Sequence, residues 1–220
     1  MRIWVTRAQP QAAATAARLS TLGHEPVVAP VIEPRLVPFG LEDLAEAEVL
    51  AVTSQAGVAA LARFAPQLKA LPVFAVGDAT AAAASQAGFE RVYSASGRVG
   101  DLVAMIAARP GLGTIVHVSA REPAGDLVGD LVRAGRSARR LVAYETLPTR
   151  LAAMPEAIEA VIIHSAQAAR AVAAMILPHQ TQNLTLYGLS KDSVLPLKAF
   201  NFNKIAVAQF ANEESILSLL

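Results

Sequence analysis

Small polar residues follow most of the apolar runs in this sequence, at points where a helix is expected to begin. They are Thr6-Arg7, Thr53-Ser54, Thr80 within Gly77-Asp78-Ala79-Thr80, Ser119 with Arg121, Ser165, and Ser190 within Gly188-Leu189-Ser190. A hydroxyl at the start of a helix accepts a hydrogen bond from a free backbone N–H, and this capping role alone explains each residue taken singly. Taken together, several helix N-termini would form a surface that binds carboxylates or phosphates. Such a surface needs few basic side chains, in keeping with a net charge of +1.

The residue types exclude several other kinds of chemistry. The chain has no cysteine, which excludes thiolate metal sites, disulfides and cysteine nucleophiles. The four histidines lie far apart without the spacing of metal ligands: His24, His117, His164 and His179. Phosphate-loop, dinucleotide and Gly-x-Ser-x-Gly patterns are absent. His164 adjoins Ser165, but neighbours on a strand point to opposite faces, so we expect His164 to be merely tolerated there. We expect no metal site.

Tyr144 stands at the exit of a predicted strand, where the chain is expected to pass from one half of the molecule to the other. Its counterpart at the other predicted crossing is Ile32, so the two crossings differ by a hydroxyl. A linker tyrosine packed on the protein, with its hydroxyl in water, is an equally valid interpretation of the sequence alone.

The composition points to a folded protein without nucleic-acid or membrane partners. Of the 220 residues, 54% are hydrophobic and only 5% aromatic, and 19 basic side chains nearly balance 18 acidic ones. A nucleic-acid-binding protein normally has a basic excess. The segment Met1–Arg7 lacks the apolar run of a signal peptide. No stretch approaches the roughly 20 apolar residues of a membrane span. We therefore expect a cytoplasmic protein.

Short apolar runs alternate with longer alanine-rich segments that have helical periodicity, such as 11–22 and 166–176. The expected strands are 3–6, 26–29, 49–53, 73–76, 91–93, 114–118, 139–143, 160–164, 184–187 and 204–207. Strands that alternate with helices predict an α/β fold, with parallel sheets covered by helices on both faces. The loops at the carboxyl ends of the strands are then the expected functional loops.

The sequence contains an internal repeat. Ser54 and Ser165 each follow an apolar run and lie 111 positions apart, and the same offset separates Gly77 from Gly188. Two anchors at one offset indicate a duplication. The segment 3–34 matches 115–146 at an offset of 112, with Gly23 and Gly135 each expected to end a helix in a left-handed conformation.

The repeat predicts a discontinuous domain organisation. Residues 1–34 and 147–220 would form one five-stranded domain, and 36–143 would form a second domain inserted into it. Two proline-marked segments, 32–36 and 144–148, would connect them as a hinge. A single ten-stranded sheet is the alternative, and neither copy needs the other to complete a five-stranded core.

The order and spacing of several motifs resemble the uroporphyrinogen-III synthase family over essentially the whole chain. They are Val5-Thr6-Arg7, Leu22-Gly23-His24-Glu25-Pro26, Val52-Thr53-Ser54, Ala75-Val76-Gly77-Asp78-Ala79-Thr80-Ala81, Val142-Ala143-Tyr144-Glu145-Thr146-Leu147-Pro148 and the ending Asn212-Glu213-Glu214-Ser215-Ile216-Leu217. The resemblance implies two flavodoxin-like domains with parallel five-stranded sheets, a two-segment connector and a cleft between the domains.

The resemblance also implies a reaction. The substrate would be hydroxymethylbilane, a linear tetrapyrrole with eight carboxylates. Ring A would lose its hydroxyl as water, and attack by the substituted carbon of ring D would give a spiro intermediate. Fragmentation and reclosure would leave ring D inverted in uroporphyrinogen III, the product of this step in haem biosynthesis. No cofactor is implied, and a monomer is favoured.

Carried over by motif, Tyr144 matches a cleft tyrosine that assists departure of the hydroxyl, as a hydrogen-bond donor or general acid. Thr80 matches a cleft threonine. The remaining predicted substrate-binding residues are Thr6, Arg7, Thr53, Ser54, Ser119, Arg121, Ser165 and Ser190. Two positions depart from the family pattern. The segment Ser119-Ala120-Arg121-Glu122 stands where many relatives have an Arg-Gly pair, so Arg121 would serve from a shifted position or not at all. Lys191 occupies the place that Thr80 holds in the first glycine turn, so Ser190 would supply the hydroxyl there.

Two other functions remain open at this point. A non-catalytic two-lobed protein could close on a small anionic ligand, and the absence of an export signal counts against a periplasmic receptor of this kind. A flavodoxin-like response or electron-transfer protein would need an acidic pocket or a flavin loop, and the sequence shows neither.

Overall fold

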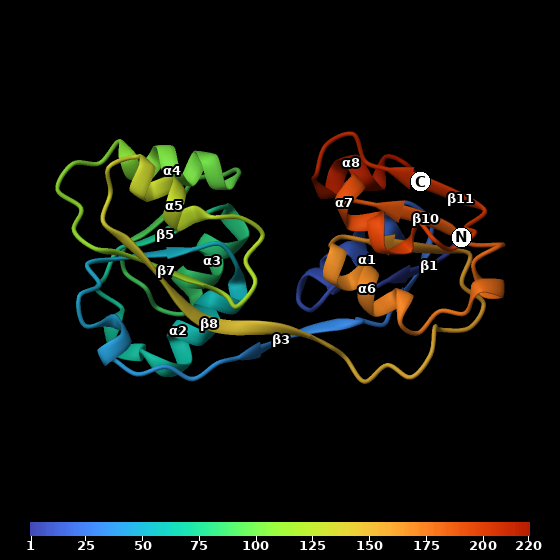
Figure 1. Ribbon diagram of the computed structural model, residues 1–220, viewed down its shortest axis with the longest axis horizontal. Helices are drawn as coiled ribbons and strands as arrows, with labels where there is room; N and C mark the ends of the chain where they lie inside the picture. The colour runs from blue at the N-terminus through green and yellow to red at the C-terminus, as the bar shows by residue number, and fades with distance from the viewer. The chain divides into compact units, whose positions relative to one another are not determined.

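The computed structural model describes all residues, 1–220, as two compact units (Figure 1). Unit 1 comprises Met1–Glu33 and Leu147–Leu220, and unit 2 comprises Pro34–Thr146. Each unit contains a sheet built on parallel strands that are joined by helices. The prediction of an α/β fold with parallel sheets is therefore confirmed. No helix of the chain has the length and apolar character needed to cross a membrane.

The sheet of unit 1 has five parallel strands in the order β11-β10-β9-β1-β2. The strands are β1 (Arg2–Val5), β2 (Glu25–Val28), β9 (Ala160–Ile163), β10 (Thr185–Gly188) and β11 (Lys204–Val207). The helices are α1 (Gln11–Thr21), α6 (Ala166–Ala173), α7 (Lys191–Val194) and α8 (Glu213–Leu217), with 3-10 turns at Pro178–Gln180 and Leu195–Leu197. Five strands are the number that the sequence predicts for this unit.

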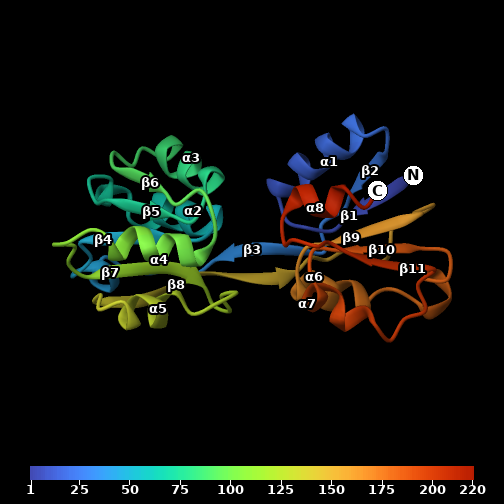
Figure 2. The same ribbon diagram turned by 90° about the horizontal axis from the view of Figure 1, so that it is seen from above.

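Both faces of this sheet are buried, as a continuous apolar run such as Ile3-Trp4-Val5 requires. Ile3 and Val5 pack on one face with residues of α1 and α8. Trp4 packs on the other face with residues of α6 and α7. Figure 2 shows these two pairs of helices on opposite sides of the sheet. The alternation of side chains along one strand thus supplies both cores.

The sheet of unit 2 has six strands in the order β3-β8-β7-β4-β5-β6. The strands are β3 (Ile32–Leu36), β4 (Val49–Val52), β5 (Val73–Ala75), β6 (Val92–Ser94), β7 (Ile115–Ala120) and β8 (Ala138–Pro148). The helices are α2 (Gln55–Phe64), α3 (Asp78–Gln86), α4 (Val99–Ala107) and α5 (Leu127–Arg133), with 3-10 turns at Glu42–Leu44 and Pro66–Leu68. Residues of α2 and α3 pack on one face of the sheet, and residues of α4 and α5 on the other.

The prediction of a five-stranded sheet is wrong for unit 2, because the expected connector segments are strands. Residues 32–36 form β3 at the edge of the sheet, and β8 continues to Pro148 instead of ending at 143. An edge strand tolerates proline, since the missing N–H can face away from the ladder. Just after β3, the N–H of Val37 donates to the carbonyl of Ala143 at 2.9 Å. Pairing satisfies backbone groups that an isolated connector would leave to water.

The repeat is visible in the helix caps. Ser54 and Ser165 have the same extended conformation, with φ of −155° and −152°, and each accepts a hydrogen bond from the N–H three residues later at 3.2 Å. Gly23 and Gly135 both have positive φ, of 80° and 77°, as left-handed helix ends require.

The glycine anchors of the repeat are not equivalent in the structure. Gly77 is the N-cap of α3, whereas Gly188 is the last residue of β10 and Ser190 caps α7. The expectation that both glycines take the same place in the turn is therefore wrong. Two residues separate strand from helix in both turns, but the helix begins one residue after Gly77 and three residues after Gly188.

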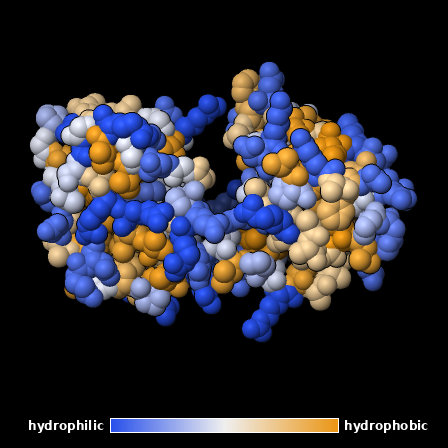
Figure 3. Space-filling model, in the orientation of Figure 1, coloured by the Kyte–Doolittle hydropathy of each residue, from blue (hydrophilic) through white to orange (hydrophobic).

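Polar and apolar residues are interspersed on the faces that Figure 3 presents. The exposed large hydrophobic side chains lie on separate elements and include Leu22, Leu41, Val132, Leu177 and Phe210. Single exposed apolar residues of this kind are ordinary in globular proteins. We therefore assign no docking surface to them.

Gly57 fixes how closely α2 approaches the sheet of unit 2. A Cβ atom at this position would lie 2.8 Å from the backbone carbonyl oxygen of Val118 in β7. We expect Gly57→Ala to lower the free energy of unfolding by about 1–3 kcal/mol, the usual cost of overpacking. Gly100→Ala in α4 is the matched control, because its Cβ would meet no atom within 4 Å. Chemical denaturation of both variants checks this, and equal stabilities would contradict the close packing.

Candidate functional site

Each sheet contains one point at which the chain's connectivity changes direction. In unit 1 this point lies between β1 and β9, and in unit 2 between β4 and β7. In open parallel sheets, ligands bind outside the carboxyl ends of the strands at such a point. Most of the predicted site residues lie at or just after these strand ends: Thr6 and Arg7 after β1, Ser165 after β9, Thr53 and Ser54 after β4, and Ser119 and Arg121 at the end of β7.

In unit 2, a hydrogen bond joins two of the predicted residues. The Ser54 hydroxyl donates to the Tyr144 hydroxyl at 2.7 Å and accepts from the N–H of Gly57 at 3.2 Å. Ser54 therefore caps α2 and holds the tyrosine at the same time. With the serine as donor of this bond, the hydroxyl of the tyrosine can donate to another acceptor.

Tyr144 is not an accessible linker residue, as one interpretation of the sequence supposed. It lies within β8, is 8% exposed and belongs to the core of unit 2. A bulge between β7 and β8 skips Ala143, so that Tyr144 pairs with Ala120. The bulge places the adjacent residues Ala143 and Tyr144 in the same core cluster. Bulges often redirect a side chain in this way.

Burial raises the pKa of the Tyr144 hydroxyl, while hydrogen bonds from Ser54 and from the backbone of Ala120 act in the opposite direction. The net effect is a pKa above the ordinary tyrosine value of 10.0. Tyr144 is therefore neutral at physiological pH. It can act as a hydrogen-bond donor without any further adjustment of its acidity.

Thr53 is paired with a histidine that sequence reasoning left out of the site. Thr53 Oγ1 lies 3.2 Å from Nε2 of His117, a buried residue in the middle of β7. Burial and, to a smaller extent, the charge of Arg140 lower the pKa of His117 to about 4. The ring is thus neutral near pH 7 and orients the Thr53 hydroxyl. No spacing rule could have found this pair, since it depends on β4 and β7 being neighbours.

Arg121 is held by an acidic residue of β8. Its Nε lies 3.1 Å from Glu145 Oε2, and Arg35 of β3 pairs with the other oxygen of the same carboxylate. Hydrogen bonds from Arg35 and then from Arg121 hold the pKa of Glu145 below its usual value. The Arg121 side chain remains 57% exposed, so part of its guanidinium faces solvent.

Ser119 and Thr80 are both buried in unit 2. The Ser119 hydroxyl donates to the carbonyl of Ala120 at 3.0 Å. Thr80 lies in the first turn of α3, where the N-cap is Gly77 and not the threonine. A capping role for Thr80 is therefore wrong.

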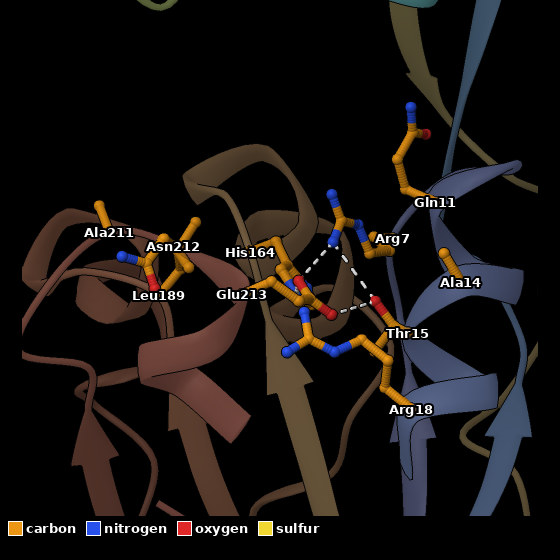
Figure 4. A pocket seen from close by; sticks show the side chains of 10 residues that line it. All are labelled: Arg7, Gln11, Ala14, Thr15, Arg18, His164, Leu189, Ala211, Asn212 and Glu213. Atoms are coloured by element: carbon orange, nitrogen blue, oxygen red, sulfur yellow. Dashed lines mark hydrogen bonds and ion pairs between the residues drawn. The ribbon is translucent and has the colours of Figure 1, made fainter. Parts of the chain in front are cut away.

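In unit 1, Arg7 belongs to a group of side chains that is centred on Glu213 and includes three residues not predicted from the sequence. Arg7 Nη1 donates to Glu213 Oε2 at 2.7 Å and to Thr15 Oγ1 at 3.3 Å, and Thr15 donates to Glu213 Oε1 at 2.5 Å. His164 Nε2 lies 3.0 Å from Glu213 Oε2. The expectation that His164 is merely tolerated is wrong, because it is 7% exposed and bonded to a carboxylate. Figure 4 shows these side chains converging on Glu213.

The charges of this group follow from its surroundings. Burial raises the pKa of Glu213, but hydrogen bonds from His164 and Thr15 and the charge of Arg7 outweigh burial and lower the pKa to about 2. Burial also lowers the pKa of His164 despite its bond to Glu213. A neutral ring donates through Nε2, because a carboxylate only accepts. Its Nδ1 is buried without a partner.

The other predicted residues of unit 1 have structural partners. Thr6 is fully buried and donates to the carbonyl of Ile162 at 2.7 Å, which links β1 to β9. Ser165 and Ser190 cap α6 and α7. Lys191 is the first residue of α7 and is exposed. No three His, Asp or Glu side chains of the chain converge to hold a metal ion.

A family model for uroporphyrinogen-III synthase HemD matches residues 13–218 of the sequence. The chain belongs to the uroporphyrinogen-III synthase family. This membership confirms the resemblance that the sequence motifs indicated. A search of curated protein sequences gives no match.

Two solved structures of uroporphyrinogen-III synthases have a similar fold. The enzyme from Helicobacter pylori is 18% identical, with a TM-score of 0.70, and the alignment covers 99% of this chain and 96% of that one. A mutant enzyme from Thermus thermophilus is 17% identical, with a TM-score of 0.53 and coverage of 99% and 95%. At these identities the likeness concerns the fold, and the roles of individual residues must come from the geometry of this chain.

The buried His117 gives this uroporphyrinogen-III synthase family member a testable dependence of stability on pH. Its pKa falls from 6.5 to about 4 on folding, so the unfolded chain binds the proton more tightly. The stabilising effect of a neutral His117 is complete above pH 6.5 and disappears as the pH falls toward 4. We expect the free energy of unfolding to fall in this range more steeply for the wild type than for His117→Gln, by at most about 1.4 kcal/mol per pH unit. Urea denaturation at several pH values measures both, and parallel curves would contradict the assignment.

Proposed function

We propose that this chain converts hydroxymethylbilane to uroporphyrinogen III, with loss of water and inversion of ring D. The observation that carries the proposal is the Ser54–Tyr144 hydrogen bond at the switch point of unit 2, in a chain that belongs to the uroporphyrinogen-III synthase family. A neutral tyrosine can donate a hydrogen bond or a proton to the hydroxyl that leaves the substrate carbon, and this donation assists its departure.

In the proposed first step, the bond between ring A's methylene carbon and its hydroxyl breaks. The oxygen leaves as water, and Tyr144 donates a hydrogen bond or its proton to that oxygen. The electrons of the pyrrole nitrogen complete the azafulvene, and the N–H proton that this nitrogen gives up completes the water or restores the proton of Tyr144. Burial and the hydrogen bond to Ser54 hold the tyrosine in one orientation, so little reorganisation accompanies the step. Ring D then attacks to give the spiro intermediate.

Substrate carboxylates are proposed to bind at polar groups of both units. In unit 2, the proposed carboxylate-binding residues are Thr53, Ser54, Thr80, Ser119 and Arg121. In unit 1, they are Thr6, Arg7, Ser165 and Ser190. The caps of α2 and α6 place a serine hydroxyl and a helix N-terminus at the carboxyl ends of β4 and β9. Fixing a flexible linear tetrapyrrole so that its two ends meet would supply much of the rate enhancement.

We also propose that the two units are flavodoxin-like domains and that 32–36 and 144–148 serve as their connector. The strand order of unit 1 supports this, because counted along the unit it is 2-1-3-4-5. A monomeric, cytoplasmic enzyme without a cofactor completes the proposal.

The identity of the product isomer tests the proposed function. We expect the purified protein to convert freshly generated hydroxymethylbilane to the type III isomer, whereas the spontaneous reaction gives type I. Chromatographic separation of the oxidised porphyrins measures the ratio. A folded sample that yields only type I would exclude the enzyme and favour a non-catalytic protein that binds a small anion.

Tyr144→Phe tests the proposed proton donor. We expect kcat to fall by a factor of about 100 or more, the usual contribution of a positioned acid. Stability should fall by only about 1 kcal/mol, because a single buried hydrogen bond is lost.

Tyr187→Phe is the matched control for this substitution. Tyr187 is 4% exposed, in β10 of unit 1, so the change removes a hydroxyl from a tyrosine that is equally buried. Steady-state kinetics should separate the two variants. Equal rates for Tyr144→Phe and the wild type would assign Tyr144 to packing alone.

A further inference from the structure

A pocket of about 340 Å³ lies at the switch point of unit 1, within a single compact unit. Residues after β1 and β9, from α1 and from the start of α8 line it. Its polar side chains are Arg7, Gln11, Thr15, Arg18, His164, Asn212 and Glu213, and Figure 4 shows them around one opening. The pocket is therefore at the place where an open parallel sheet binds a ligand.

Arg7 is the cationic side chain of this pocket that hydrogen bonds hold in place. Its Nη1 makes both of the contacts to Glu213 and Thr15, and Figure 4 shows the other terminal nitrogen pointing away from Glu213. A guanidinium has five donors in a planar fork, so one side can be anchored while another binds a carboxylate. Arg7 keeps its charge at neutral pH although burial lowers its pKa.

The pocket retains a positive charge after Glu213 is counted. Arg7 and Glu213 neutralise each other, His164 is neutral near pH 7, and Arg18 lines the pocket without making an ion pair. An anion would therefore meet the anchored guanidinium of Arg7 and the guanidinium of Arg18, which makes no ion pair. A neutral or cationic ligand would gain nothing from this arrangement.

Glu213 links the pocket together. Its carboxylate accepts hydrogen bonds from Arg7, Thr15 and His164, which come from three different elements of the unit. A carboxylate that receives several donors is fixed in one orientation, and it fixes its partners in turn. The His164 ring, just after β9, is buried and lies 3.0 Å from one oxygen of this carboxylate.

We propose that this pocket binds one carboxylate of the substrate through Arg7 and Arg18, and that Glu213 is the positioning residue that holds Arg7 for this contact. The identity of the ligand rests on the proposed function, since a tetrapyrrole with eight carboxylates supplies the anion. The pocket's preference for an anion rests on its own geometry and charge.

Binding of uroporphyrin I, a closed tetrapyrrole with eight carboxylates, tests the pocket independently of turnover. Quenching of the porphyrin's fluorescence gives the Kd at low and high salt. Arg7→Lys keeps the ion pair with Glu213 but loses the planar fork. We expect this variant to bind uroporphyrin I roughly tenfold more weakly, the factor that corresponds to one charge-assisted hydrogen bond, with little change in Tm.

Glu213→Gln and Glu214→Gln form a matched pair, because both remove one negative charge from the start of α8. Glu213 is bonded within the pocket, whereas Glu214 is exposed and makes no ion pair. We expect Glu213→Gln to weaken uroporphyrin I binding and raise KM by about tenfold while kcat changes little. Glu214→Gln should neither weaken binding nor raise KM, because Glu214 lines a second pocket with Arg18 and its loss removes only a negative charge there. Thr15→Val, which removes one hydroxyl and no charge, should give a smaller loss in the same direction.

The outcomes separate this proposal from the proposed function. If Arg7→Lys and Glu213→Gln lose thermal stability but bind uroporphyrin I as the wild type does, the group only fastens α8 to the sheet and the proposal is overturned. If Glu213→Gln does not fold, thermal stability and uroporphyrin I binding are compared in Arg7→Lys and Thr15→Val instead. Wild-type binding by both of these variants overturns the proposal. If the wild type gives only the type I isomer while Arg7→Lys still weakens binding, the enzyme assignment fails and the carboxylate site stands.

Discussion

The hydrogen bond between Ser54 and Tyr144 joins residues 90 positions apart, and the geometry of unit 2 is what makes it possible. It requires β4, β7 and β8 to lie next to one another, and it requires α2 to approach β7 closely enough that only glycine fits at position 57. A bulge after Ser119 then directs Tyr144 into the same core face as Ala143. The serine that begins α2 completes the bond. One polar contact thus depends on sheet order, helix packing and strand register together.

The two units use one plan for different chemistry. Ser54 and Ser165 cap their helices with the same backbone conformation, yet the residue before each differs: Thr53 pairs with a neutral histidine, whereas His164 pairs with a carboxylate. Unit 2 therefore has a neutral tyrosine hydroxyl bonded to a serine at its switch point, and unit 1 has a charged group centred on Glu213. We infer that the duplication supplied two equivalent scaffolds, one suited to proton donation and the other to anion binding.

Much of this arrangement could be predicted from the sequence, because apolar runs and capping residues act locally. The parallel α/β fold, the caps at Ser54, Ser165 and Ser190 and the grouping of polar residues at strand ends all follow from local patterns. The sixth strand was missed because Pro34 and Pro148 suggest a linker, although Pro34 lies in the edge strand β3, which accepts proline, and Pro148 is the last residue of β8. His117, Thr15 and Glu213 were missed because their partners lie far away in the sequence. The burial of Tyr144 depends on a bulge that leaves no mark in the sequence.

A double-mutant cycle on Ser54 and Tyr144 tests most directly whether the two hydroxyls act as a unit. The rate of the single turnover is compared for wild type, Ser54→Ala, Tyr144→Phe and the double variant. If the serine acts through the tyrosine, the double variant is no slower than Tyr144→Phe alone, and the coupling energy is about 1 kcal/mol or more. If the two losses of activation free energy simply add, Ser54 contributes to the reaction independently of Tyr144. The hydrogen bond between the two hydroxyls would then have no role in catalysis.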